Sequence, residues 1–407
     1  MTGRRFLVAW VAATLAIAGS GAATAASPAL DLFDEATYWL VLGYGGHSDV
    51  HPRDLVRERR VAVAESCTSD PVCPEAIGID AVQRLIAQLD DGHTSYLDPE
   101  AFARLRTALG GDGSARGIGL MVRAPSNGLG LVVVDVLPGG PAARQDLRRG
   151  DRVMAIGGAF LPALARGRWE TWDGALRAES VTILVLRAGA KPREVLLEPE
   201  PMATDREATL SWAEPEVALL RIPSFLPALR VAPRVHALVA EATAAGATAI
   251  IVDVRDNPGG ALTDCLAASG AFIAHASRRV VSRLVTSHVT YEGGVVGIRT
   301  STDTLVPQLT LDEPARFDGP IAVVVNGASA SCAEFLALDQ QGRGLVIGEQ
   351  TAGVADSTTA FFALPNGAGL QVTTAMVQNA GGSTDASSVM PDVPVDDDLM
   401  VLANGID

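Results

Sequence analysis

One segment in the C-terminal third places a serine where nucleophilic chemistry is possible. Residues 323–335 have the sequence VVVNGASASCAEF, in which an apolar run ends and small residues precede an expected helix. This order predicts a strand, a sharp turn and a helix, with Ser331 at the helix N-terminus. The N–H groups and the dipole of a helix N-terminus stabilise a developing oxyanion. A purely structural interpretation competes, because Ser331-x-x-Glu334 is also a capping box.

Two other turns contain groups that would complete such a site. Residues 250–262 (IIVDVRDNPGGAL) predict a strand followed by a glycine turn, and free N–H groups there could donate to an oxyanion. Residues 91–97 (DGHTSYL) place His93 in a turn directly after an expected helix. Neither segment is specific alone, because an ordinary strand–helix loop and a structural histidine explain them equally well.

Helices and strands must bring these turns together. In the largely helical residues 30–108, the apolar residues at 82, 85, 86 and 89 follow one helical face. We expect that helix to end at residues 90–92, with Gly92 in the left-handed position. After Glu198 we expect strands at 217–222, 248–254, 320–326 and 344–348, and helices at 235–245 and 332–341. This alternation predicts a largely parallel, covered sheet.

Composition limits the class of protein. The chain has 407 residues, enough for two or three domains, and 47 acidic against 32 basic side chains give a net charge of −15. That charge argues against binding to nucleic acid or to an anionic membrane. The sequence contains no metal-binding motif and no phosphate-binding G-K-[ST] motif, so we expect no metal and no cofactor.

The first residues predict an exported protein. Two arginines, an apolar stretch over residues 6–19 and Ala-Thr-Ala at 23–25 are typical of a cleaved signal peptide, here residues 1–25. We therefore expect a periplasmic or extracellular protein without stable membrane insertion after cleavage; a single anchoring helix is the alternative. Cys67 and Cys73 are expected to pair in an oxidising compartment. The sequence leaves open whether Cys265 and Cys332 pair.

Residues after the glycine-rich linker at 110–114 resemble a PDZ domain of the bacterial protease type. The resemblance rests on expected strands at 131–136, 152–156 and 181–187 and on the turns LPGGPAA at 137–143 and LRRGDRV at 147–153. The place of that family's carboxylate-binding loop is taken by four residues, Gly117, Ile118, Gly119 and Leu120. Successive N–H groups on such a loop capture a peptide's terminal carboxylate while the peptide adds as a strand.

Taken together, the three turns and the PDZ-like region resemble the C-terminal processing (tail-specific) serine peptidases, in the same order along the chain. The resemblance implies an α/β fold with a ClpP/crotonase-like peptidase core at 201–407, an inserted PDZ-like β domain at 111–200 and an N-terminal helical region at 26–110. It implies Ser331 as the nucleophile and an oxyanion hole from Gly259, Gly260 and Cys332. Substrates would be polypeptides with free C-termini.

The sequence departs from this family at the position of the general base. The family carries a T-F-G-K-G segment, whereas residues 348–354 here are GEQTAGV, so that Val354 stands in place of the lysine. Lys191 is the only lysine of the chain, and it falls inside the PDZ-like region. A Ser–Lys dyad is therefore not expected.

A serine hydroxyl still needs a base to act as a nucleophile near neutral pH. His93 matches the place of the histidine in the tricorn-like branch of the family, where an imidazole would accept the serine proton and return it to the leaving amine. The resemblance points to Asp385 as the carboxylate that orients this ring. Asp90 and Asp91 are alternatives because they are close to His93 in sequence.

Three functions are compatible with this expected fold. The first is an exported serine endopeptidase that cleaves unfolded or C-terminally recruited polypeptides through a Ser331–His93 mechanism. The second is a catalytically inactive, peptide-binding pseudoprotease, and the third is a carrier of apolar ligands, since a retinoid-binding protein shares the peptidase-like domain. The distance between the Ser331 hydroxyl and the His93 ring bears on the choice.

Overall fold

The computed structural model describes nine segments, residues 27–68, 72–110, 116–163, 167–176, 178–201, 207–226, 230–300, 304–383 and 387–406. The expected signal peptide, most of the expected linker and Asp385 lie outside the described residues. Within the described part of the chain, no helix is both long and apolar enough to cross a membrane.

The N-terminal region is helical, as its pattern predicts. Four helices and one short strand form it: α1 (Pro28–Gly43), α2 (Pro52–Ser66), α3 (Glu75–Leu89), β1 (Ser95–Leu97) and α4 (Pro99–Gly110). The disulfide Cys67–Cys73 is present and joins the end of α2 to the start of α3, which confirms that expectation. The apolar face of α3 packs against α1 in one core.

The end of α3 differs from the expectation. Asp90, not Gly92, takes the left-handed conformation, with a φ of 48°. Aspartate tolerates this region better than most residues because its short polar side chain bonds locally. The helix therefore stops two residues earlier than a glycine signal suggested, and the turn that carries His93 begins at Asp90.

The PDZ-like region is a small β domain. Its sheet has the order β3-β4-β5-β7-β8, so β3 is an edge strand. The strands and helices of this domain are β2 (Arg116–Gly117), β3 (Leu120–Arg123), β4 (Leu131–Val136), α5 (Pro141–Arg144), β5 (Arg152–Ile156), β6 (Ala159–Phe160), η1 (Leu161–Ala163), α6 (Arg168–Leu176), β7 (Val181–Leu186), β8 (Arg193–Leu197) and β9 (Glu200–Pro201). The three strands expected here agree with β4, β5 and β7 to within one residue.

The peptidase-like core contains the expected, mainly parallel sheet, with the order β10-β11-β12-β17-β18-β21. Only β10 runs antiparallel to its neighbour. Its members and their helices are β10 (Thr209–Glu214), β11 (Val217–Arg221), α7 (Val231–Ala244), β12 (Ala249–Asp253), α8 (Leu262–Ser269), β17 (Ile321–Val325), α9 (Cys332–Gln340), β18 (Leu345–Gly348) and β21 (Val393–Pro394). The ends of β12 and β17 carry the glycine turn and the serine turn.

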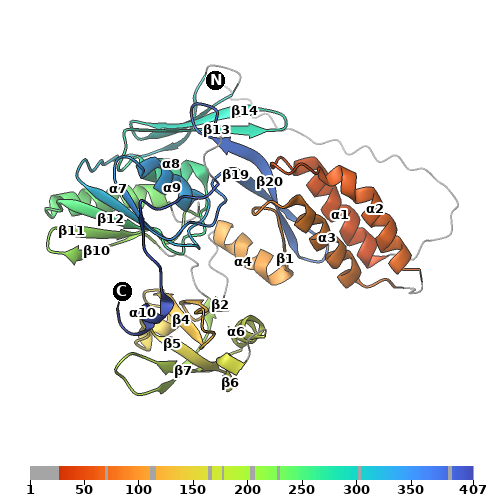
Figure 1. Ribbon diagram of the computed structural model, residues 1–407, viewed down its shortest axis with the longest axis horizontal. Helices are drawn as coiled ribbons and strands as arrows, with labels where there is room; N and C mark the ends of the chain where they lie inside the picture. The colour runs from red at the N-terminus through yellow and green to blue at the C-terminus, as the bar shows by residue number, and fades with distance from the viewer. Residues whose placement is uncertain are drawn as a thin grey trace, which may run out of the picture.

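A second, antiparallel sheet covers the other side of these helices. It has the order β1-β20-β13-β14-β15-β16, and β19 also pairs with β20. The remaining strands are β13 (His275–Ser282), β14 (Thr286–Glu292), β15 (Val295–Arg299), β16 (Val306–Thr310), β19 (Ser357–Ala363) and β20 (Gly369–Gln378). Helix α8 contacts this sheet, while α7 and α9 contact strands of the parallel sheet. Figure 1 shows the three helices between the two sheets.

Two elements pack against a domain other than the one to which we assigned them from the sequence. Strand β1 pairs with β20, so the N-terminal region is joined to the core through one sheet. Helix α10 (Leu399–Ala403) packs on Val132 and Val134 of β4 in the PDZ-like domain, although it follows the core in sequence. Figure 1 shows α10 and the C-terminus beside β4.

A close approach between α1 and α3 yields a first prediction. A Cβ on Gly78 would lie 2.3 Å from the carbonyl oxygen of Ala29, so Gly78→Ala should lower the free energy of unfolding by about 1–3 kcal/mol. Gly174→Ala is the matched control, because Gly174 also lies in a helix and has open space around it. The control should be neutral or stabilising by about 0.5–1 kcal/mol. Thermal unfolding of both variants checks this, and equal effects would contradict the packing argument.

Candidate active site

Ser331 occupies a strained turn between β17 and α9. Its φ of 53° and ψ of −112° lie in a region that non-glycine residues rarely adopt. Such strain persists only where the surroundings hold it. Ser329 supplies part of that restraint: its Oγ accepts the N–H of Asn326 at 3.0 Å and donates to the carbonyl of Val254 at 2.8 Å. The serine turn is thereby fixed to the end of β12.

Glu334 holds the other side of this turn. Its Oε2 accepts the N–H of Ser331 at 2.7 Å, which is one half of the capping box that the sequence suggested. The Ser331 side chain supplies the other half of the capping box, as acceptor for the N3 backbone N–H. A hydroxyl that accepts at the cap still has its own proton to donate.

The glycine turn lies directly against Ser331. A Cβ on Gly259 would be 2.8 Å from the Ser331 Cβ and 3.0 Å from the backbone nitrogen of Cys332, so only glycine fits there. The N–H of Gly259 donates to Asn257 Oδ1 at 2.8 Å. Within the described segments, the N–H groups of Gly260 and Cys332 have no acceptor. Gly259 thus supplies space, while Gly260 and Cys332 keep their N–H groups available.

Asn257 joins the glycine turn to the serine turn. Its carbonyl accepts the N–H of Ala330 at 2.9 Å, and its side-chain amide donates to the carbonyl of Ile222 at 2.8 Å. The side chain is fully buried. Gly260 in turn pairs with Phe225. Both turns are therefore held in fixed register at the ends of neighbouring parallel strands.

An ionic cluster adjoins these turns and includes a residue of the PDZ-like domain. Asn326 donates to Asp256 at 3.1 Å and to Asp397 at 2.8 Å. Arg123 of β3 contacts Asp397 at 2.6 Å and Asp256 at 3.3 Å. Burial alone would raise the pKa of Asp397, but Asn326, Arg255 and Arg123 hold it below its usual range. The PDZ-like domain is thus bonded to the residues that support the glycine turn.

His93 sits in a turn closed by Asp91. The Asp91 Oδ1 accepts the backbone N–H groups of His93 at 2.9 Å and of Thr94 at 2.8 Å. The ring Nδ1 lies 2.8 Å from the Oγ of Ser357, the first residue of β19. Asp91 therefore fixes the backbone, whereas a hydroxyl orients the ring. Asp90 is exposed and makes neither contact, and sequence reasoning missed Ser357 because no motif marks it.

The surroundings of His93 favour a neutral imidazole. Burial lowers the pKa of His93 from its ordinary value of 6.5, and the carboxylates of Asp91 and Asp356 oppose this only in part. The ring is consequently uncharged near neutral pH. When Nδ1 carries the proton toward Ser357, Nε2 is the basic nitrogen.

The loop over residues 349–357 brings the His93 and Ser331 turns together. The N–H of Val354 donates to the same Glu334 oxygen as the N–H of Ser331, at 3.1 Å. A Cβ on Gly92 would lie 3.3 Å from Val354 Cγ1. Among the described residues, no hydrogen bond joins the His93 ring to the Ser331 hydroxyl directly. The two turns meet at Val354, the residue at which the resemblance would place a lysine.

The described residues place neither the expected Asp385 nor the chain's single lysine, which we did not expect there, in this site. Asp385 lies outside the described residues; the carbonyl of Ser387, two residues later, accepts the N–H of Ala355 at 2.8 Å. Lys191 lies in the exposed turn between β7 and β8 of the PDZ-like domain. The only ammonium side chain of the protein is therefore on a different domain from Ser331.

The expected carboxylate-binding loop leads into the edge strand β3. Ile118 is buried, and its carbonyl accepts the N–H of Ala142 at 3.0 Å. Gly119 has a φ of 75°, and its carbonyl accepts the N–H of Leu137 at 2.9 Å. The loop is thus tied to the start of α5, and Leu120 opens the strand whose outer edge is unpaired within its sheet.

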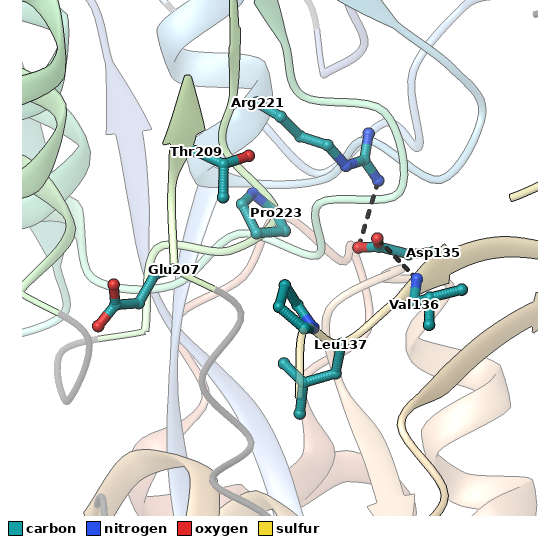
Figure 2. Close-up of a pocket in the computed structure, with 8 residues that line it drawn as sticks. Asp135, Val136, Leu137, Glu207, Thr209, Arg221 and Pro223 are labelled. Atoms are coloured by element: carbon teal, nitrogen blue, oxygen red, sulfur yellow. Dashed lines mark hydrogen bonds and ion pairs between the residues drawn. The ribbon is translucent and has the colours of Figure 1, made fainter. Parts of the chain in front are cut away.

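A pocket of about 520 Å³ lies where the PDZ-like domain meets the core. Figure 2 shows Arg221 of the core pointing toward Asp135 of β4, with a separation of 3.6 Å between their charged groups. Pro223, on the core side, is two residues before Phe225, which pairs with Gly260. The lining residues are Asp135, Val136, Leu137, Pro138, Glu207, Thr209, Arg221 and Pro223.

Comparisons with known proteins agree on one family. The profile of Peptidase family S41 matches residues 216–395, and that of the PDZ domain matches residues 108–166. The chain is 27% identical to a chloroplastic C-terminal processing peptidase of Tetradesmus obliquus, over 81% of this chain and 70% of that protein. It is 28% identical to a tail-specific protease of Haemophilus influenzae, over 65% of this chain and 36% of that protein.

A solved structure shares the fold. The photosystem II D1 C-terminal processing protease superposes with a TM-score of 0.53 at 23% identity, covering 93% of this chain and 98% of that one. The matched profiles fall on the β domain and on the core that carries the serine and glycine turns. From the agreement of profiles and relatives it follows that residues 216–395 form a domain of Peptidase family S41, a serine-type peptidase, in a chain that also carries a PDZ domain.

Proposed function

We propose that this protein is an exported endopeptidase that cleaves unfolded or C-terminally recruited polypeptides, with Ser331 as nucleophile and His93 as general base. The observation that carries the proposal is the strained Ser331 turn, where two N–H groups without an acceptor among the described residues lie beside a hydroxyl whose proton remains available to a base. The match to C-terminal processing peptidases supports the same activity.

The proposed nucleophilic step uses groups from three turns. The Ser331 Oγ attacks the scissile carbonyl, and the carbonyl oxygen becomes an oxyanion that accepts the N–H groups of Gly260 and Cys332. Because Cys332 is the first residue of α9, the helix dipole adds to this stabilisation. Gly259 allows the close approach of the two turns.

The proposed base is the Nε2 of His93. It would take the proton of Ser331 as the bond to the substrate forms and return it to the leaving amine. Ser357 holds the ring tautomer through Nδ1, and Asp356 and Asp91 stabilise the imidazolium that forms, since both favour the charged ring. Substrate binding would have to bring the ring into reach of the hydroxyl, because catalytic hydrogen bonds are often looser before substrate binds.

The proposed recruitment uses the PDZ-like domain. A substrate C-terminus would bind the loop of residues 117–120 and add as a strand to the free edge of β3. The pocket beside Arg221 and Asp135 lies between that domain and the core residues just before Phe225, the partner of Gly260, and we propose that it takes a substrate side chain. Because strand addition needs an extended chain, unfolded polypeptides would be the preferred substrates. Export is supported by the two disulfides and by the expected signal peptide.

Substitution of the two central residues tests the mechanism. Ser331→Ala should lower kcat for a denatured protein such as casein by at least about 10⁴-fold, and His93→Ala by about 10³-fold or more, because nucleophile and base act as a unit. Lys191→Ala is the control and should keep full activity, since Lys191 lies in the exposed turn between β7 and β8, outside the loop of residues 117–120 and strand β3.

Two results would count against this assignment. Full activity in both Ser331→Ala and His93→Ala would eliminate the mechanism. A wild-type protein that binds C-terminal peptides without hydrolysing them or reacting with a fluorophosphonate probe would instead identify a peptide-binding pseudoprotease.

The pH dependence follows from the pKa of His93. Since burial lowers this pKa below 6.5 and the base must be neutral, kcat/KM should hold at mildly acidic pH and fall only as the pH drops through the lowered value. The acid limb of the pH profile should therefore have its midpoint below 6.5. A midpoint above that value would show that the ring is stabilised in its charged form.

A methyl group at the glycine turn provides a further test. Gly259→Ala should lower kcat by about 10²-fold, because its Cβ would lie 2.8 Å from the Ser331 Cβ and displace the turns that carry the N–H donors. Gly246→Ala is the matched control, with a similar φ of 89° and open space around it. Both should lose about 1–2 kcal/mol of stability from backbone strain. Comparable losses of kcat would contradict the proposed geometry.

A further inference from the structure

The second disulfide of the protein lies beside the proposed oxyanion hole. Cys332 follows Ser331 directly and opens α9, and Cys265 lies in α8, five residues after Gly260. Their Cα atoms are 5.7 Å apart, and both residues are fully buried. The bond therefore connects the helix that follows the glycine turn to the helix that follows the serine turn, as the adjacent α8 and α9 in Figure 1 illustrate.

The two N–H donors belong to separate turns that are far apart in sequence. Gly260 and Cys332 are held together by the hydrogen bond from Ala330 to Asn257 and by the contact of Gly259 with Ser331. The disulfide spans 67 residues and is, within the described chain, the one covalent link between α8 and α9. Since an oxyanion hole acts only when both donors point at the same atom, a small shift of α9 against α8 would weaken it.

We propose that the Cys265–Cys332 disulfide positions the N–H of Cys332 against that of Gly260, and that peptidase activity consequently depends on the oxidation state of this pair. The inference rests on the proposed function of Ser331. A dithiol reductant would transfer two electrons: the S–S bond breaks, Cys265 and Cys332 each gain a proton as thiols, and the dithiol becomes a disulfide. Cys265 and Cys332 are thus positioning residues.

With this arrangement the protein would have low peptidase activity until the disulfide forms after export. In a reducing compartment the two thiols would remain unpaired and the hole would be loosely ordered. The pair would form only in an oxidising compartment, where the substrates of an exported peptidase are located. The Cys67–Cys73 bridge closes a local loop between α2 and α3 and has no such connection to Ser331.

The test uses the double variant Cys67→Ala/Cys73→Ala, in which every remaining cysteine belongs to the pair beside Ser331. This variant is reduced with dithiothreitol, its thiols are counted, and kcat and KM are measured on a C-terminal peptide substrate before reduction, after reduction and after reoxidation. When reduction has released two thiols per chain, we expect kcat to fall by about 10-fold or more and KM to change by less than about 2-fold. Activity should return on reoxidation.

A second variant and a measurement of folding distinguish loss of the disulfide from loss of the folded structure. Cys265→Ala/Cys332→Ala should show the reduced kcat permanently and no response to dithiothreitol, while circular dichroism confirms a folded chain at the assay temperature. Equal kcat in the oxidised, reduced and Cys265→Ala/Cys332→Ala forms would overturn this inference and leave the proposed function intact. If the oxidised parent hydrolyses nothing, the proposed function itself fails.

Discussion

The buried carboxylate of Glu334 is the contact on which the site depends. One oxygen accepts the N–H groups of Ser331 and Val354, and the other accepts the N–H of Gly353 and the hydroxyl of Thr351. Burial raises the pKa of Glu334, and these donors oppose that effect. A buried charge is tolerated only when it is bonded in this way. Because the bonded groups come from α9 and from the loop over residues 351–354, one side chain fixes the serine turn and the loop relative to each other.

The second sheet explains how a residue from the N-terminal region reaches a site built on the parallel sheet. Strand β1, directly after the His93 turn, pairs with β20, and Thr373 of β20 bonds Asp91 and Thr94. Strand β19, which pairs with β20, begins at Ser357, the partner of the His93 ring. The antiparallel sheet is therefore the frame that carries His93 to the loop beside Ser331.

Sequence reasoning was most successful where a local pattern determines the structure. Apolar runs bounded by glycine or small residues predicted β4, β5, β12 and β17 closely, and the serine and glycine turns followed from them. The antiparallel sheet was missed, because its strands carry mixed polar residues and are specified by long-range pairing. The role of Ser357 depends on a contact 264 residues away, which no local spacing encodes. The hydrogen bond from the Gly259 N–H to Asn257 Oδ1 was likewise missed, because the motif does not mark Asn257 as its acceptor.

The position of α10 has a consequence for any study of peptide recognition in isolation. Leu399 and Leu402 cover Val132 and Val134, and Asp397, just before the helix, bonds Arg123 on the edge strand. A fragment spanning only residues 111–200 would expose those valines to water and release the guanidinium from its carboxylate. Peptide affinities determined on such a fragment would describe a surface that the intact molecule does not present. Peptide binding should therefore be measured on the whole chain.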